Sequence, residues 1–198
     1  MVKRSFDIIM ALVGLILLLP FFLLIALAIV VDSKGGVFYK QERIGKGRKP
    51  FNLLKFRSMS VGADKKGLLT VGSNDSRVTK VGLFIRKYKL DELPQLINIL
   101  TGDMSFVGPR PEVKKYVDQY SVEQLKVLQV RPGLTDYASL EYFNENELLS
   151  KSPNPEEAYI KEVMPAKLNL NFKYIENQGF FTDLKLIFRT IGRVLGCR

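Results

Sequence analysis

The sequence predicts an α+β protein: a membrane-inserted, re-entrant N-terminal helix, then a small, mostly helical domain with a short β-hairpin and interfacial amphipathic helices. Three observations support this fold class. Residues 8–31 carry no charged side chain, two short apolar stretches flank a glycine-containing basic loop, and apolar residues recur at helical spacing in the second half of the chain. We divide the chain into a membrane-inserted part, residues 1–33, and a cytosolic domain, residues 34–198.

The apolar segment is long enough to cross a bilayer, because a helix of residues 8–31 extends about 36 Å. Pro20 lies near its middle, where a proline removes a backbone hydrogen bond and bends or breaks a helix. Basic residues, which mark the cytoplasmic side, flank both ends of the segment. They are Lys3 and Arg4 before it, and Lys34, Lys40, Arg43, Lys46, Arg48, Lys49, Lys55 and Arg57 after it.

We therefore favour a helix that enters one leaflet, bends at Pro20 and returns, with arms of about 17 Å each. A straight spanning helix is the main alternative. A cleaved signal peptide fits less well because the apolar stretch is too long and a basic stretch follows it. A buried core helix fits less well because the segment has no polar face.

Composition restricts the chemistry that the chain can perform. Lys and Arg number 30 against 20 Asp and Glu, so the net charge is +10 and an anionic partner is expected: nucleic acid, anionic lipid or a phosphorylated substrate. The absence of histidine excludes Ser-His triads and histidine-based zinc sites. A metal would have to bind carboxylates and substrate phosphates, which favours magnesium or manganese. The single cysteine, Cys197, rules out a disulfide within the chain and favours a reducing compartment.

After the apolar segment, residues 37–39 and residues 51–56 are expected to form two short strands. Residues 41–50 between them contain two glycines, a proline and several basic side chains, so we expect a loop that connects a hairpin. Residues 60–79 are rich in small and polar side chains and predict an irregular segment.

Two amphipathic runs follow. In the first, Val81, Phe84, Ile85 and Tyr88 have the i, i+3, i+4, i+7 spacing of one helix face. The second run consists of Leu93, Leu96, Ile97 and Leu100, and Gly102 is expected to end it. Residues 108–111, Gly-Pro-Arg-Pro, predict a stiff turn. A short helix is expected over residues 121–129 with Ser121 as its cap, then a stiff loop at residues 131–133 and a further helix from about Glu156.

The last helix has the clearest pattern. Its apolar residues step by three and four positions with basic side chains elsewhere on the wheel: Phe181, Leu184, Phe188, Ile191 and Leu195. Such a stripe either faces the protein core or lies in the membrane interface, and the sequence leaves both interpretations open.

Asp91 and Glu92 are the candidate catalytic residues. Acidic side chains also occur at ordinary helix starts, where they interact favourably with the free N–H groups, and Pro94 is tolerated there. The cations around the pair favour a catalytic role over an ordinary helix start, because carboxylates among cations are expected to stay ionised. An ionised aspartate can attack phosphorus and form an acyl-phosphate.

Such an attack brings an anion towards an anionic pyrophosphate, so basic side chains or a divalent cation must offset the repulsion. The candidate phosphate-binding residues are Lys55, Arg86, Arg110 and Arg131. Arg110 and Arg131 are the stronger candidates because neighbouring Pro and Gly residues fix their backbones, and a guanidinium held in this way can bind phosphate through two hydrogen bonds.

Together, these motifs resemble those of the bacterial sugar transferases, specifically the small monotopic phosphoglycosyl transferases that start polysaccharide and glycoconjugate assembly. The matching elements, in chain order, are the apolar segment with Pro20, Gln41-Glu42-Arg43-Ile44-Gly45, Leu54-Lys55-Phe56-Arg57-Ser58-Met59, Leu90-Asp91-Glu92-Leu93-Pro94-Gln95-Leu96, residues 102–111 and Arg131-Pro132-Gly133-Leu134-Thr135. After the last motif many members continue Gly-Trp-Ala-Gln, whereas this chain has Asp136-Tyr137-Ala138-Ser139, a difference that could bear on sugar choice.

The resemblance implies transfer of a phosphosugar from a UDP-sugar to a polyprenyl phosphate, typically undecaprenyl phosphate, with release of UMP. Asp91 would be the nucleophile and a ligand of Mg²⁺, and Glu92 would assist the second step or position the metal. Lys55, Arg86 and Arg110 would bind substrate or phosphate. Residues 34–198 would be the catalytic domain, on the cytoplasmic face of the bacterial inner membrane. The re-entrant helix is implied as well.

Two other classes of function stay open from the residues themselves. One is a membrane-anchored basic binding or scaffold protein without catalysis, and the other is a metal-dependent nuclease or phosphatase. We expect no nucleic-acid partner, because no recognisable nucleic-acid module is present. The lipid bilayer is an expected partner, and the sequence leaves a homo-oligomer open.

Overall fold

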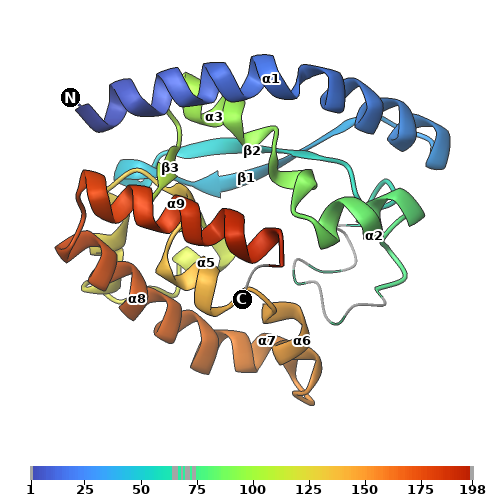
Figure 1. The fold of residues 1–198 in the computed structure, drawn as a ribbon. Helices are drawn as coiled ribbons and strands as arrows, with labels where there is room; N and C mark the ends of the chain where they lie inside the picture. Colours follow the sequence, from blue (N-terminus) through green and yellow to red (C-terminus); the bar gives the residue numbers. More distant parts are fainter. Residues whose placement is uncertain (1, 64–66, 68, 70–71, 73–74, 197–198) are drawn as a thin grey trace.

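The computed structural model describes residues 2–63, 67, 69, 72 and 75–196 (Figure 1). Its longest element is α1 (Val2–Asp32), which lies along one side of the other elements. The helix continues through Pro20, so it is not broken there, and a bend at Pro20 stays a prediction. The re-entrant arrangement itself stays a prediction. By length and composition α1 is apolar enough to cross a membrane.

Both ends of α1 are attached to the same domain. Near its start, the Lys3 ammonium donates to the Val107 carbonyl and the Tyr174 hydroxyl, each at 2.8 Å, and it pairs with Asp183. At its end, the Asp32 carboxylate accepts from the backbone N–H of Val81 at 2.9 Å. A helix attached at both ends in this way has its two ends on one side of the domain.

The two faces of α1 have different neighbours. Ala11 packs with Leu96 and Ile99, while Ile29 packs with Phe56 and Ile85. The outward face remains exposed and apolar, and includes Ile16, Leu17, Leu19, Phe21, Leu23, Leu24, Leu27 and Val31. The helix therefore covers the domain with one stripe and presents the rest of its apolar surface outward.

The predicted hairpin is present. β1 (Phe38–Ile44) and β2 (Pro50–Phe56) pair antiparallel, with Phe38 opposite Phe56 and Ile44 opposite Pro50. The first strand is longer than the sequence predicted, because Gln41–Ile44, expected to be loop, continue the ladder. The ladder ends at a tight turn where Gly47 and Arg48 have positive φ values of 66° and 62°.

A second, smaller sheet was not predicted. β3 (Ser105–Val107) and β4 (Gly133–Thr135) pair in parallel, each only three residues long. Their backbones approach so closely that a Cβ on Gly133 would lie 2.1 Å from the Gly108 nitrogen. Glycine is therefore required there for steric reasons, and this contact sets the position of the Pro-Arg-Pro loop that follows β3.

The helical elements agree with most sequence-based boundaries. α2 and α3 match the two amphipathic runs, and Gly102 ends α3 with a φ of 100°. Ser121 accepts from the Gln124 N–H ahead of a 3₁₀ turn, as its capping role predicted. The bounds are α2 (Lys80–Lys87), α3 (Gln95–Thr101), α4 (Lys114–Val117), η4 (Gln124–Gln129), α5 (Tyr137–Glu141), α6 (Glu145–Ser150), α7 (Pro155–Ala158), η5 (Tyr159–Val163), α8 (Met164–Glu176) and α9 (Phe180–Val194). Of the segment predicted to be irregular, residues 64–66, 68, 70–71 and 73–74 lie outside the described residues.

The C-terminal helix α9 resolves one open alternative. Two residues of its predicted apolar stripe are exposed away from the other elements, since Phe181 and Phe188 are 84% and 65% exposed, whereas Ile191 and Leu195 line a cleft. The core-facing interpretation is therefore wrong for Phe181 and Phe188. The side that packs inward carries Asp183 and Leu186, because Asp183 pairs with Lys3 of α1.

Candidate functional site

An open cleft of about 520 Å³ lies between the hairpin, the segment that joins α2 to α3, and the C-terminal helices. Asp91, Glu92, Lys55, Arg86 and Arg110 all line it. The structure thus brings together, from four separate segments of the chain, the two predicted catalytic residues and three of the predicted phosphate-binding residues.

The acidic pair sits in a short turn of its own. It forms η3 (Leu90–Glu92), a single 3₁₀ turn, whereas the sequence predicted that it begins the second helix. α3 starts only after Pro94. Lys89, just before the pair, adopts the left-handed conformation with φ 55° and ψ 19°. A non-glycine residue in that region is uncommon and is found repeatedly at functional sites.

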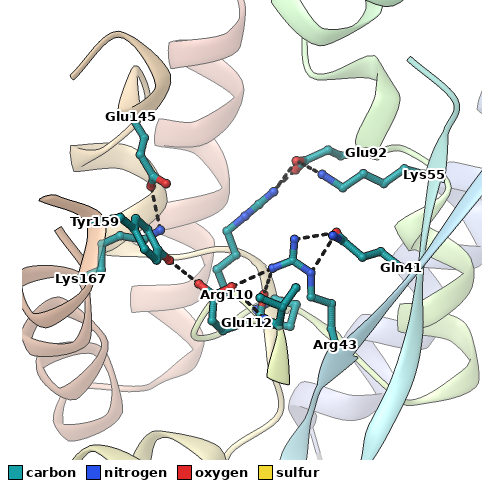
Figure 2. A network of polar contacts seen from close by, with 11 residues as sticks. Gln41, Arg43, Lys55, Glu92, Arg110, Glu112, Glu145, Tyr159 and Lys167 are labelled. Atoms are coloured by element: carbon teal, nitrogen blue, oxygen red, sulfur yellow. Dashed lines mark hydrogen bonds and ion pairs between the residues drawn. The ribbon is translucent and has the colours of Figure 1, made fainter. Parts of the chain in front are cut away.

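Glu92 is bound by two cations. Arg110 donates through both terminal nitrogens, one to each carboxylate oxygen, and the Lys55 ammonium donates to Oε1 at 2.9 Å (Figure 2). Burial opposes the ionisation of Glu92, but the charges of Arg110 and Lys55 outweigh it and hold the pKa of Glu92 well below its usual value. The predicted ionised carboxylate is confirmed here.

Asp91 has a different environment. Its side chain is buried, at 5% exposure, and within the described part of the chain no basic side chain pairs with it at ion-pair distance. Burial raises the pKa of Asp91 and the neighbouring Glu92 carboxylate adds to this, while Lys55 and Arg86 act in the opposite direction. The expectation of a low pKa is therefore wrong for Asp91, because loss of hydration outweighs the nearby cations.

Lys89 is a cation of the cleft that the sequence did not single out as a ligand-binding residue. Its ammonium lies 5.0 Å from the centre of the Phe143 ring, and the Arg193 guanidinium lies 5.5 Å from the same ring. Burial, together with repulsion from Arg110 and Lys55, lowers the pKa of Lys89 despite attraction from Glu92. In the sequence, the only local indication that Lys89 belongs to the cleft was its position two residues before Asp91.

A second polar network continues from Arg110 along the same wall (Figure 2). Glu112 accepts from the Arg43 guanidinium at 3.1 Å and from the Tyr159 hydroxyl, and Arg43 also donates to the Pro111 carbonyl at 3.0 Å. Beside it, Lys167 pairs with Glu145 at 2.7 Å. The network fixes the Pro-Arg-Pro loop from both sides. Sequence patterns could not reveal it, because Glu112 and Tyr159 are far apart in the chain.

Arg131 lies elsewhere. Its side chain is exposed, donates to the Gly102 carbonyl at 3.0 Å, and is not among the residues that line the cleft. The structure therefore does not bring it together with Arg110, although both are held by neighbouring prolines. Pro20, the predicted bend, belongs to α1 and is not among the residues that line the cleft.

A magnesium ion is compatible with these residues on chemical grounds. Among the described residues there is no group of three or more acidic, histidine or cysteine side chains that could enclose a metal. Asp91 nevertheless supplies a carboxylate in the cleft. Magnesium commonly uses one or two carboxylates together with substrate phosphates and water, so a full protein cage is not needed.

Comparison with known proteins identifies relatives along the whole chain. The family model for bacterial sugar transferases matches residues 1–197. UDP-N-acetylgalactosamine-undecaprenyl-phosphate N-acetylgalactosaminephosphotransferase of Aeromonas hydrophila is 36% identical over 199 residues, which cover 98% of this chain and 44% of that protein. UDP-glucose:undecaprenyl-phosphate glucose-1-phosphate transferase of Escherichia coli (strain K12) is 37% identical over 195 residues, covering 96% and 39%.

A third relative is covered more fully. UDP-glucose:undecaprenyl-phosphate glucose-1-phosphate transferase of Caulobacter vibrioides is 36% identical over 196 residues, covering 98% of this chain and 69% of that protein. The chain therefore spans less than half the length of the Aeromonas and Escherichia relatives and about two thirds of this one.

Proposed function

The chain belongs to the bacterial sugar transferase family, and from this membership we propose that it transfers a phosphosugar from a UDP-sugar to a polyprenyl phosphate such as undecaprenyl phosphate. The released nucleotide is UMP. The reaction proceeds through a covalent aspartyl-phosphosugar on Asp91.

The observation that carries this proposal is the contrast between the two adjacent carboxylates. Glu92 is neutralised by Arg110 and Lys55, whereas Asp91 is buried in the cleft without an ion-pair partner among the described residues. A nucleophilic carboxylate needs an oxygen that is not held by a fixed cation, and Asp91 meets this condition among the described residues. The nearby basic side chains favour binding of a pyrophosphate beside it.

The first step forms a bond from an Asp91 oxygen to the β-phosphorus of the UDP-sugar and breaks the bond to the α-phosphate, whose electrons leave with UMP. In the second step an oxygen of the polyprenyl phosphate attacks the same phosphorus, and the Asp91 carboxylate leaves. Arg110 and Lys55, held in place by Glu92, orient the phosphate oxygens. Mg²⁺ held by Asp91 and substrate phosphate would neutralise charge on the phosphate oxygens.

The membrane orientation is part of the proposal. The outward apolar face of α1 and the exposed Phe181 and Phe188 of α9 enter the cytoplasmic leaflet of the bacterial inner membrane, and the catalytic domain stays on the cytoplasmic side. Both ends of α1 are attached to one domain, which supports this arrangement over a straight span. Such placement brings the cleft to the depth where a lipid phosphate is presented.

Replacing Asp91 by asparagine tests the reaction. The variant should lose both UMP release and the radiolabelled sugar phosphate on the protein, while Asp118→Asn, on a 57% exposed surface carboxylate, should retain both. UMP release by the Asp91 variant at the wild-type rate would exclude Asp91 as the nucleophile. A wild-type protein that releases no UMP from any UDP-sugar would instead favour a scaffold role.

Labelling tests the orientation. Cys197, which is the sole cysteine of the sequence, is replaced by serine, and a single cysteine is introduced at Val2. In sealed inverted vesicles, whose outer surface is the cytoplasmic one, an impermeant maleimide should label this cysteine. Labelling only after the vesicles are opened would contradict the arrangement.

A further inference from the structure

Two residues that line the cleft each carry a buried polar atom with no hydrogen-bond partner in the described part of the chain. These atoms are the Oδ1 of Asn171 and the Oγ of Ser139, both enclosed by protein. Asn171 as a whole is only 6% exposed. Buried polar groups are nearly always paired, and an unpaired one destabilises the fold by about 1–3 kcal/mol. A buried acceptor and a buried hydroxyl, on residues that line a cleft, therefore indicate a polar ligand.

The two residues come from neighbouring helices that fix their positions. Ser139 is in α5, where Asp136 caps the helix by accepting from the Ser139 N–H at 2.6 Å. Asn171 is in α8, one turn beyond Lys167, so both lie on one face of that helix. Figure 2 shows Lys167 and Glu92 on opposite sides of Arg110. Asn171 thus belongs to the wall that faces the acidic pair across Arg110.

The chemistry of this wall differs from that around Asp91. Near Asp91 the cleft offers cations, which suit phosphates, whereas Ser139 and Asn171 offer an uncharged hydroxyl and an uncharged amide. Sugar hydroxyl and acetamido groups both donate and accept hydrogen bonds, so they can pair with an amide oxygen and a serine hydroxyl at once. A sugar attached to a phosphate held at Arg110 would meet Ser139 and Asn171 on this side, beside the mutually neutralised Lys167–Glu145 ion pair.

Building on the proposed function, we propose that Ser139 and Asn171 form the subsite that binds the transferred sugar and thereby select which UDP-sugar is used. Each residue pairs with a substituent of the sugar ring. Sites that hydrogen-bond a substrate group discriminate strongly against analogues that lack it, because the buried protein group is then left unpaired. Donor preference is accordingly set at α5 and α8, away from the acidic pair.

The test compares Asn171→Leu, Asn171→Asp and Ser139→Ala with wild type on UDP-glucose, UDP-galactose and their two N-acetylated counterparts. Asn171→Asp keeps the acceptor oxygen, and Ser139→Ala removes a single atom, so both guard against loss of folding. Asn169→Leu is the matched control, because Asn169 lies on the same helix but is exposed. The measured quantities are the initial rate of UMP release, KM for each sugar nucleotide, and inhibition by added UMP.

We expect Asn171→Leu and Ser139→Ala to lower kcat/KM for the preferred donor by about three- to tenfold, the effect of one lost neutral hydrogen bond. The ranking of donors should change, and inhibition by UMP should not, because UMP lacks the sugar. Asn169→Leu should leave all three quantities as in wild type.

Two outcomes would overturn the subsite. An equal loss for every donor with weakened UMP inhibition would assign the residues to the nucleoside. Unchanged donor preference in folded variants would indicate that buried water, and not the sugar, pairs with the Asn171 oxygen and the Ser139 hydroxyl. Both results presuppose that wild type releases UMP, so they are separate from a failure of the proposed function itself, in which wild type would be inactive on all donors.

Discussion

The pairing of Arg110 with Glu92 leads to a quantitative prediction for Arg110→Lys. Arginine donates to both oxygens of Glu92 from a planar group, whereas lysine keeps the charge but lacks that fork. The substitution therefore removes one charge-assisted hydrogen bond without removing the cation. Hydrogen bonds to charged groups contribute about 1.5–3 kcal/mol. Because the Arg110 side chain is 32% exposed, the lower part of that range applies, about 1.5–2 kcal/mol.

If this pairing orients the cation that meets the phosphate, kcat/KM for UMP release should fall by about ten- to thirtyfold. The assay is the initial rate of UMP release by purified protein in detergent, over a range of UDP-sugar concentrations. Arg131→Lys is the matched control: the same change is made in an exposed arginine outside the cleft, and its rate should stay within about twofold of wild type.

A double-mutant cycle identifies the partner. Glu92→Gln alone should also lower the rate, and the double variant should be less impaired than the product of the two single effects, with a coupling of about 1.5 kcal/mol. Additive effects, within about 0.5 kcal/mol, would show that Arg110 does not act through Glu92. Wild-type activity in Arg110→Lys would refute a role for the bidentate contact between Arg110 and Glu92.

Three further predictions concern the metal and the stability of the fold. Treatment with EDTA should abolish UMP release and added Mg²⁺ should restore it; activity that persists in EDTA would contradict a metal requirement. Lys3→Met leaves Asp183, only 9% exposed, without its ionic partner, and because Lys3 is 40% exposed it should destabilise the protein by about 1.5 kcal/mol, seen as a lower melting temperature in detergent, whereas an unchanged value would contradict the attachment of α1. Burial raises the pKa of Asp136, so the folded state retains its proton to higher pH and loses stability as pH rises from about 4 through the raised value. Asp136→Asn keeps a capping side chain but does not titrate, so its melting temperature relative to wild type should increase between pH 4 and pH 7; a constant difference would contradict the raised pKa.

Local patterns predicted the helices because each helix is determined within a few turns of sequence. The apolar spacing of residues 81–88, the glycine at 102 and the start near Glu156 all have local causes, and the structure agrees with them within a residue or two. The hairpin was predicted for the same reason. Its first strand was underestimated because polar side chains such as Gln41 and Arg43 resemble a loop when the partner strand is unknown.

Contacts between distant segments could not be predicted in this way. The parallel pair of β3 and β4 brings together strands of three residues each, too short for an alternating pattern to appear. The orientation of α9 depends on the ion pair between Asp183 and Lys3 of α1. Sequence periodicity does not reveal which residues far apart in the chain will pair. Arg131 and Arg110 have similar proline-bound surroundings in sequence, yet only the Arg110 side chain reaches the cleft, whereas the Arg131 side chain donates to the Gly102 carbonyl.

The different environments of Asp91 and Glu92 follow from the turn that contains them. Successive side chains in a 3₁₀ helix point about 120° apart, so two adjacent residues there cannot face the same partners. Glu92 faces Lys55 of β2 and Arg110 of the rigid loop, and it becomes a fixed counterion. Asp91 makes no ion pair within the described part of the chain and is a buried carboxylate near Lys55 and Arg86. The left-handed Lys89 and the separate 3₁₀ turn keep the acidic pair out of α3, which begins only at Gln95, and the two acids have separate environments in this turn.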